Sequence, residues 1–367
     1  MAGSRWLAAT HGPNGSTLQE FERSHPCIRP HQTPSFVTFV GKKEKASTLR
    51  QLLGEPASGR PFEPHGQVWL WSDPKTRQDE SPLVFIDCEA HNYSASHWQA
   101  CDDRGQVISR KIDWLQPGGR CSKALGMQLT NAVLAPFSNA VCYFAPDLGG
   151  LRGVSRVIAG QLLANPKHNL PRAVSPCILV LLNTSSTTFD ASIAETRLHN
   201  MIQREMTALR SESREDKGEA GVDSGVRNAR VVGLSTRLDD GARSAALRRR
   251  LQSISREAQR ARSSSRLRFR FDHFRALSSS LLDHFCFEPS RPFSFIEASR
   301  PRAFTSREFP THLQELVERM PSQAWLWHAV APLVSSALAL ASYPPGAHRT
   351  MAAPPNVWKP ADSRCLF

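Results

Sequence analysis

PSFVTFVGKKEKASTLRQLL (34–53) is the stretch that decides the fold. Its first seven residues are a short β-branched and aromatic run, which is typical of a strand. A lysine-rich loop follows from Gly41, and the apolar spacing of STLRQLL (47–53) predicts a helix. The stretch therefore predicts a strand, a loop and a helix in that order.

Further apolar runs predict five more strands: GQVWLWS (66–72), PLVFIDC (82–88), NAVCYFA (139–145), PCILVLLN (176–183) and ARVVGLS (229–235). Helical patterns lie between the later strands, at 123–136, 152–164 and about 190–210. Only about ten residues separate the first two of these strands, fewer than a parallel crossover needs, so they are predicted to form an antiparallel hairpin. The whole pattern predicts a three-layer α/β domain with a mixed, mainly parallel sheet.

Composition and periodicity together predict that the chain is divided into four segments. Residues 1–33 and 344–367 are rich in proline and polar residues and are expected to be a disordered lead-in and a disordered tail. The α/β domain is assigned to 34–241, with a flexible polar insertion at 211–226. Helical spacing continues from there, so 242–343 is expected to be an all-helical C-terminal extension.

The loop GKKEKAST (41–48) matches a phosphate-binding loop only in part. The pattern G-x-x-x-x-G-K-[ST] supplies glycine amides and a lysine to phosphates, and a hydroxyl to magnesium. Gly41 and Thr48 fit this pattern, whereas Ala46 and Ser47 replace the second glycine and the lysine. The missing charge could come from a neighbouring lysine, or these lysines could be solvated loop residues: Lys42, Lys43 and Lys45.

Later strands end in residues that also match GTPase motifs in part. Asp87 occupies the aspartate of D-x-x-G and could bind magnesium, or it could merely end a buried strand, and Ala90 replaces the glycine. Asn183 begins a segment without the aspartate that reads guanine in N-K-x-D, and 233–236 matches a guanine-contacting turn weakly. We therefore predict a vestigial nucleotide site, with Thr48 and Asp87 as candidate magnesium ligands, made of Gly41, Lys42, Lys45, Ala46, Ser47, Thr48, Asp87, Ala90 and Asn183.

Several segments together resemble a known family: PSFVTFVG, GQVWLWSDP, SPLVFIDCEA, LTNAVLAPFSNAVCYF, ILVLLNTS, FDHF, PFSFIEAS and APLVSSALALAS. They look like successive blocks of the fungal GTPase-like P-loop domain found N-terminal to patatin-like phospholipase domains. The resemblance runs from about 34 to 343 and implies a small-GTPase-like P-loop NTPase fold. Intact members carry G-K-[ST] and D-C-E-G, so this sequence departs at Ala46, Ser47 and Ala90. It contains no G-x-S-x-G nucleophile elbow, so no lipase chemistry follows.

Two other groups of residues suggest different chemistry. Cys88, His91, His97 and Cys101 could bind zinc, or they could be a buried cysteine followed by loop residues. An arginine-rich helical stretch could bind nucleic acid or an acidic membrane surface, or it could be a solvated face, with the main candidates being Arg248, Arg249, Arg250 and Arg256.

The expected protein is cytoplasmic, because its eight cysteines lack close pairing and its N-terminus has no apolar signal core. The apolar segment 324–343 suits a buried helix better than a membrane span, and we expect no span. The expected function is that of a pseudo-GTPase-like regulatory or scaffold protein with little or no hydrolysis, no cofactor and a protein partner. The alternatives are a weak P-loop nucleotide-binding protein that uses Mg-nucleotide, and an arginine-driven nucleic-acid or membrane-surface binder.

Overall fold

The computed structural model describes residues 3–12, 15–21, 28–54, 67–88, 107–115, 122–163, 170–185, 189–213, 229–265, 267–289, 291–299, 309–319 and 322–332. The expected insertion at 211–226 lies outside these ranges from residue 214 onward. The expected disordered tail, 344–367, lies wholly outside them.

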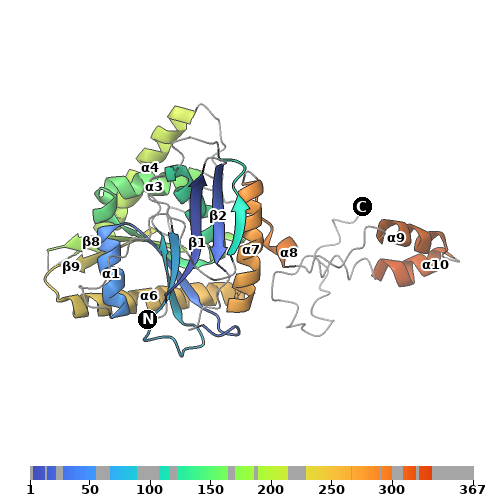
Figure 1. Ribbon diagram of the computed structural model, residues 1–367, viewed down its shortest axis with the longest axis horizontal. Coiled ribbons are helices and arrows are strands. Elements are labelled where there is room, and N and C mark those ends of the chain that lie inside the picture. The colour runs from blue at the N-terminus through green and yellow to red at the C-terminus, as the bar shows by residue number, and fades with distance from the viewer. Residues whose placement is uncertain are drawn as a thin grey trace. The chain divides into compact units, whose positions relative to one another are not determined.

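The described residues build a sheet of nine strands in the order β6-β2-β1-β4-β5-β3-β7-β8-β9 (Figure 1). The strands are β1 (Gly3–Gly12), β2 (Gly15–Phe21), β3 (Ser35–Val40), β4 (Gln67–Ser72), β5 (Leu83–Cys88), β6 (Val107–Lys111), β7 (Ser138–Phe144), β8 (Cys177–Thr184) and β9 (Ala229–Ser235). Strands β5, β3, β7, β8 and β9 are parallel, while the other four pairings are antiparallel. The predicted α/β class with a mixed sheet is confirmed, but the sheet is evenly mixed and not mainly parallel.

The predicted hairpin of β4 and β5 is confirmed, because Trp69 of β4 pairs with Asp87 of β5 in an antiparallel register. Strand β3 lies between β5 and β7, and its residues are all buried. The carboxyl ends of the five parallel strands meet at one edge of the sheet, which is where open α/β sheets bind ligands.

The expectation of a disordered lead-in is wrong for 3–12 and 15–21, which form β1 and β2. These strands pair with each other, and β1 also pairs with β4. Four consecutive residues of β1, from Trp6 to Ala9, are buried, so the strand lacks the polar alternation by which a half-buried strand is recognised. Strand β6, which was not among the predicted strands, pairs with β2.

Helices cover both faces of the sheet (Figure 1). One face packs against α1 (Lys43–Leu53) and α6 (Asp240–Ser264), in a core that joins Val37 and Phe39 of β3 to Leu49, Leu247 and Leu251. The other face packs against α2 (Ser122–Leu129), the π-helix η2 (Thr130–Leu134), α3 (Gly150–Leu163), α4 (Ala191–Ser213) and α7 (Phe271–Phe287). There Phe36 packs on Phe274 with the ring centroids 4.4 Å apart.

The chain does not divide at residue 242. Helices α6 and α7 belong to the same compact unit as the sheet, which spans 1–265 and 269–293. Leu247, Leu251 and Ile254 of α6 are part of the core, so α6 is a layer of the α/β domain and not the start of an extension. The second unit comprises 266–268 and 294–367.

The described elements of this second unit are short helices: α8 (Phe295–Ala298), α9 (Phe309–Glu318), α10 (Gln323–Trp325) and the π-helix η5 (Leu326–Val330). None of the helices in the described ranges is both long and apolar enough to cross a membrane. Residues 333–343 of the apolar segment 324–343 lie outside the described residues.

Arg248 of α6 is buried, so neither alternative that the sequence left open for it holds: it is not a solvated residue, and it is not placed to contact nucleic acid or lipid. Its Nε lies 3.3 Å from Oδ2 of Asp73, which is fully buried, and its guanidinium also donates to the carbonyl of Leu52. The ion pair with Asp73 therefore connects α6 to the end of β4, and the hydrogen bond to Leu52 connects it to α1. Arg249 and Arg256 are exposed and Arg250 is half-buried, and their predicted role stays a prediction.

Arg262, near the end of α6, is also buried. It donates to the carbonyls of Pro136 and Ser138, at 2.9 and 3.1 Å, and its guanidinium lies 5.4 Å from the ring centre of Phe269. Burial lowers the pKa of Arg262 to about 10. Two of the arginines on this helix therefore serve the interior of the domain.

We predict that Arg248→Met destabilises the domain by about 3–5 kcal/mol, because it leaves the Asp73 carboxylate buried without its cation. The matched control is Arg249→Met, one position along the same helix but exposed, which should change the free energy of unfolding by less than about 0.5 kcal/mol. Urea denaturation measures both values. Equal effects of the two substitutions would contradict the structural role of Arg248.

Candidate functional site

The candidate site lies where β3, β5, β7 and β8 end, at the carboxyl edge of the parallel strands. Gly41 follows β3, Asp87 is near the end of β5, and Asn183 is near the end of β8. Asp147 follows β7 in the short 3-10 helix η3 (Ala145–Leu148). The sheet thus brings several of the predicted site residues to one edge.

Helix α1 begins at Lys43, one turn earlier than the sequence pattern predicts. Gly41 and Lys42 alone connect β3 to α1, so residues 43–48 do not form an open loop that could encircle a phosphate. Ala46 and Ser47 are helical, and Thr48 is buried inside α1. The early start removes the need for a second glycine, because a helical residue at position 46 tolerates a Cβ.

A carboxylate of the chain caps the N-terminus of α1. Asp147 accepts hydrogen bonds from three backbone amides: those of Lys42 at 2.7 Å, Glu44 at 3.0 Å and Lys45 at 3.0 Å. The first amides of a helix have no partner within the helix and attract anions. In P-loop proteins such amides hold phosphate, and here Asp147 holds the same kind of donors.

Gly41 is needed because this carboxylate comes so close. A Cβ at position 41 would lie 2.7 Å from Oδ2 of Asp147 and 3.0 Å from Cβ of Phe144. The first glycine of the predicted loop therefore makes room for an internal acid.

Lys45 forms a buried ion pair with Asp87. The Nζ of Lys45 lies 2.6 Å from Oδ1 of Asp87, and their side chains are 4% and 1% exposed. The same nitrogen donates to the carbonyl of Cys88 at 3.4 Å. Within the described residues, neither Asp87 oxygen has an aligned hydrogen bond, so the close contact with Lys45 is what compensates its charge.

Arg243 of α6 connects α1 to the end of β8. Its Nη2 lies 2.6 Å from Oε1 of Glu44 and also donates to Oδ1 of Asn183. Asn183, the remnant of the guanine-reading motif, is thereby engaged with a side chain of the protein. Gly233, in the weakly matching 233–236 segment, faces Phe189, and a Cβ there would lie 2.6 Å from the ring.

The zinc prediction is tested only at its first residue. Cys88 is fully buried, and its Sγ lies 3.9 Å from Oγ1 of Thr130 in η2. His91, His97 and Cys101 lie outside the described residues, as does Ala90. Among the residues that the structure describes, no three His, Cys, Asp or Glu side chains group to hold a metal ion.

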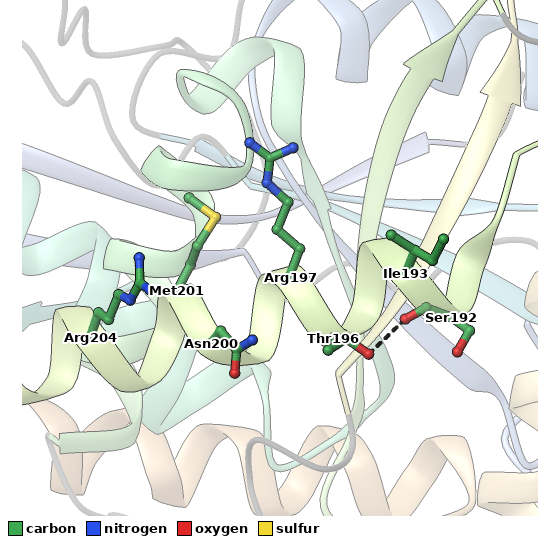
Figure 2. Close-up of a pocket in the computed structure, with 7 residues that line it drawn as sticks. All are labelled: Ser192, Ile193, Thr196, Arg197, Asn200, Met201 and Arg204. Carbon is green, nitrogen blue, oxygen red and sulfur yellow. Dashed lines mark hydrogen bonds between the residues drawn. The ribbon is translucent and has the colours of Figure 1, made fainter.

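A shallow hollow of about 550 Å³ lies along α4 (Figure 2). Its lining residues all come from this helix: Ser192, Ile193, Thr196, Arg197, Asn200, Met201 and Arg204. None of the predicted nucleotide-site residues lines it, so the hollow gives no support to the predicted site.

Three residues of this site were not predicted from the sequence: Asp147, Arg243 and Glu44. A signal for Asp147 was present, because this acid lies shortly after the apolar strand β7, and the carboxyl ends of parallel strands meet at one edge. The signal for Arg243 was weak, since Arg243 and Asn183 lie sixty residues apart in the sequence. The vestigial nucleotide-binding roles of the predicted residues stay predictions.

No protein-family model matches the chain, and no curated protein matches it. Among solved structures, it is similar to a variant of SsGBP with 12% identity and a TM-score of 0.29, over 62% of this chain and 56% of that one. A "probable GTP-binding protein engB" matches with 10% identity and a TM-score of 0.29, over 61% and 100%. A variant of Aquifex aeolicus Era bound to GDP and AlF4⁻ matches with 13% identity and a TM-score of 0.28, over 62% and 57%.

The chain thus spans little more than half of the SsGBP and Era chains. With TM-scores below 0.3, these likenesses carry no argument about family or activity. The fold described above rests on the strand order and pairing of the chain itself.

We predict that Lys45→Met destabilises the domain by about 3–5 kcal/mol, because Asp87 would remain buried without its cation. Lys43→Met is the control, since Lys43 is exposed on the same helical turn, and it should change stability by less than about 0.5 kcal/mol. The double variant Lys45→Met/Asp87→Leu should regain much of the loss, because an apolar pair can replace a buried ion pair. Urea denaturation of the three variants tests this, and a double variant less stable than Lys45→Met would contradict it.

Proposed function

We propose that this chain is a GTPase-like regulatory or scaffold protein whose nucleotide site is closed by its own side chains, so that it hydrolyses nucleotide little or not at all. The observation that carries the proposal is the Asp147 carboxylate on the amides of Lys42, Glu44 and Lys45. A nucleotide phosphate would have to displace a group that is covalently part of the protein.

The two charged side chains that phosphoryl transfer would require, a lysine and an acid, are also paired with each other. Hydrolysis of a nucleoside triphosphate depends on a lysine on the phosphates and on an acid that helps to hold magnesium. Lys45 and Asp87 are the nearest candidates, and each compensates the charge of the other at 2.6 Å. In this arrangement the residues do not fit a Mg-nucleotide, because neither charge is available without leaving the other buried and unpaired.

Two features at this edge of the sheet argue against guanine recognition. The aspartate of N-K-x-D is absent from the sequence, and Asn183 accepts a hydrogen bond from Arg243. A protein discriminates between bases when its buried polar groups form hydrogen bonds with the right base and are left without partners by the wrong one. The proposal therefore includes no preference between GTP and ATP.

A filled site suits a protein that acts through its surface. In working GTPases the γ-phosphate orders the switch loops, and hydrolysis releases them. Here the corresponding amides and charges are satisfied within the chain, so nucleotide has little differential affinity through which to shift a conformation. The proposed partner is another protein that recognises a surface independent of the nucleotide state.

We predict that Mg-GTP or Mg-ATP, added at about 2 mM, raises the melting temperature of the chain by less than about 1 °C. This concentration is high enough to reveal even a weak ligand. A ligand at about 100 times its Kd would add about 2.7 kcal/mol and shift the melting temperature by several degrees. Differential scanning fluorimetry, together with a phosphate-release assay, measures both binding and turnover. A shift of several degrees that Asp87→Ala abolishes, or turnover lost in that variant, would overturn the proposal.

A further inference from the structure

Helix α4 has one face in the core and one face outside it. It packs against α3 and β9, and its inner face is formed by residues that are fully buried, among them Leu198, Ile202 and Met206. The hollow of Figure 2 lies on the outer face, where the described residues that line it all belong to α4. The outer face is therefore open to a partner along several helical turns.

Four of the lining residues form a row along this outer face: Ile193, Arg197, Met201 and Arg204. Steps of four, four and three residues keep side chains on one side of a helix. Figure 2 shows all four side chains on the upper side of the helix as drawn. This set, called here the α4 row, alternates an apolar side chain with a positive one.

The two arginines of the α4 row have no ionic partner within the described part of the chain. Arg197 and Arg204 are exposed, and no described side chain donates to them, accepts from them or pairs with their charge. Asp190, the nearest acid before the row in the sequence, instead caps α4 by accepting a hydrogen bond from the amide of Ile193 at 3.1 Å. The row therefore presents positive charge that is not neutralised by its described neighbours.

The two apolar members of the row are also open to a partner. Ile193 is 68% exposed, one of the largest values for a bulky apolar side chain in the described chain, and Met201 is half-buried. A single exposed isoleucine is ordinary on a protein surface. Here it lies in a hollow beside a methionine and two arginines, the two residue types that are enriched at protein–protein interfaces.

We propose that the α4 row is a docking surface for an amphipathic helix of another protein. Apolar side chains of that helix cover Ile193 and Met201, and acidic side chains two turns apart pair with Arg197 and Arg204. The inference rests on the proposed function, in which the chain acts by binding a protein partner. It adds the surface that is used and the chemistry of the partner.

The spacing of the charges favours a helix over a nucleic acid. Arg197 and Arg204 are seven residues apart, which is about 10.5 Å along the helix axis and equals the repeat of acidic residues at heptad positions of a partner helix. Phosphates follow one another at shorter intervals along a strand. The row also contains no aromatic side chain on which a base could stack, and a nucleic acid would leave Ile193 in water.

Helix α6 shows what the arginine spacing alone does not provide. Arg249 and Arg256 are also seven residues apart and exposed, but the residues between them on that side include Gln252 and Ser253. None of the large apolar side chains that are highly exposed in the described ranges belongs to α6. The α6 pair can attract an anion, whereas the α4 row can also bury apolar surface.

The test measures the binding of the full chain to three fluorescein-labelled helical peptides of about 20 residues, by fluorescence anisotropy. The peptides share one leucine stripe and carry glutamate, glutamine or lysine at the same heptad positions beside it. The glutamate peptide should bind at least about tenfold more tightly than the glutamine peptide, and the lysine peptide should bind most weakly.

Two variants assign this binding to the α4 row. Arg197→Glu/Arg204→Glu should reverse the preference, so that the lysine peptide binds best. Ile193→Ser should weaken all three peptides by about fivefold or more without changing their order, because it removes an apolar anchor and no charge. All three positions are exposed, so the melting temperature of each variant should stay within about 2 °C of wild type.

The matched control is Arg249→Glu/Arg256→Glu, which makes the same change in charge at the same spacing on α6. It should leave the Kd of the glutamate peptide within about threefold of wild type, since exposed charges beyond a Debye length are screened at physiological salt. Equal losses in the two double variants would mean that the basic chain attracts acidic peptides without a docking surface, and would overturn the inference.

Two further results would overturn it: no binding of the glutamate peptide at about 100 μM wild-type chain, or equal Kd values for the glutamate and glutamine peptides. Single-stranded RNA that binds through Arg197 and Arg204, with no peptide binding, would also contradict the choice of a helix. Failure of the proposed function is a separate result, because it would be tight Mg-nucleotide binding or turnover by the wild-type chain, which none of these anisotropy measurements involves.

Discussion

The N-terminal amides of α1 need an acceptor, and the rest of the site follows from which group supplies it. With Asp147 on the amides of Lys42, Glu44 and Lys45, the helix can begin after only two connecting residues, because its first donors are satisfied at once. The early start places Lys45 on the first turn, where it reaches Asp87. It also places Glu44 where Arg243 can bind it. One carboxylate thus organises three polar contacts at the edge of the sheet.

Much of the fold could be predicted because buried parallel strands leave a strong local pattern. The continuous apolar runs at 82–88, 139–145 and 176–183 all became strands within one residue of their predicted limits. Strands β1, β2 and β6 could not be found in the same way, since β1 is buried on consecutive residues and β6 is mostly exposed. Strand β6 pairs with β2, about ninety residues away, and β1 pairs with β4, about sixty residues away, and no local period records such pairings.

Only those residues of the site that belong to a known sequence motif could be predicted. Gly41, Lys45 and Asp87 do meet at the edge of the sheet, but their contacts differ from those of the pattern that pointed to them. The decisive acid, Asp147, lies more than one hundred residues from the amides that it caps, and it belongs to no nucleotide-binding pattern. A sequence motif shows which residues of a phosphate-binding loop are missing. Only the three-dimensional structure shows which other residues contact the same backbone amides. The burial of Arg248 could not be predicted either, because its position on an arginine-rich helix indicated that the side chain contacts solvent or nucleic acid.

The most direct test of the central claim is amide hydrogen exchange at Lys42, Glu44 and Lys45, measured by NMR in the ligand-free full chain and again with Mg-GTP. Amides that are hydrogen-bonded to a group of the protein exchange slowly without any ligand. We predict slow exchange at all three positions in the ligand-free protein and no change on adding nucleotide. Fast exchange in the ligand-free protein, slowed by Mg-GTP, would contradict it and would mean that these amides wait for a phosphate.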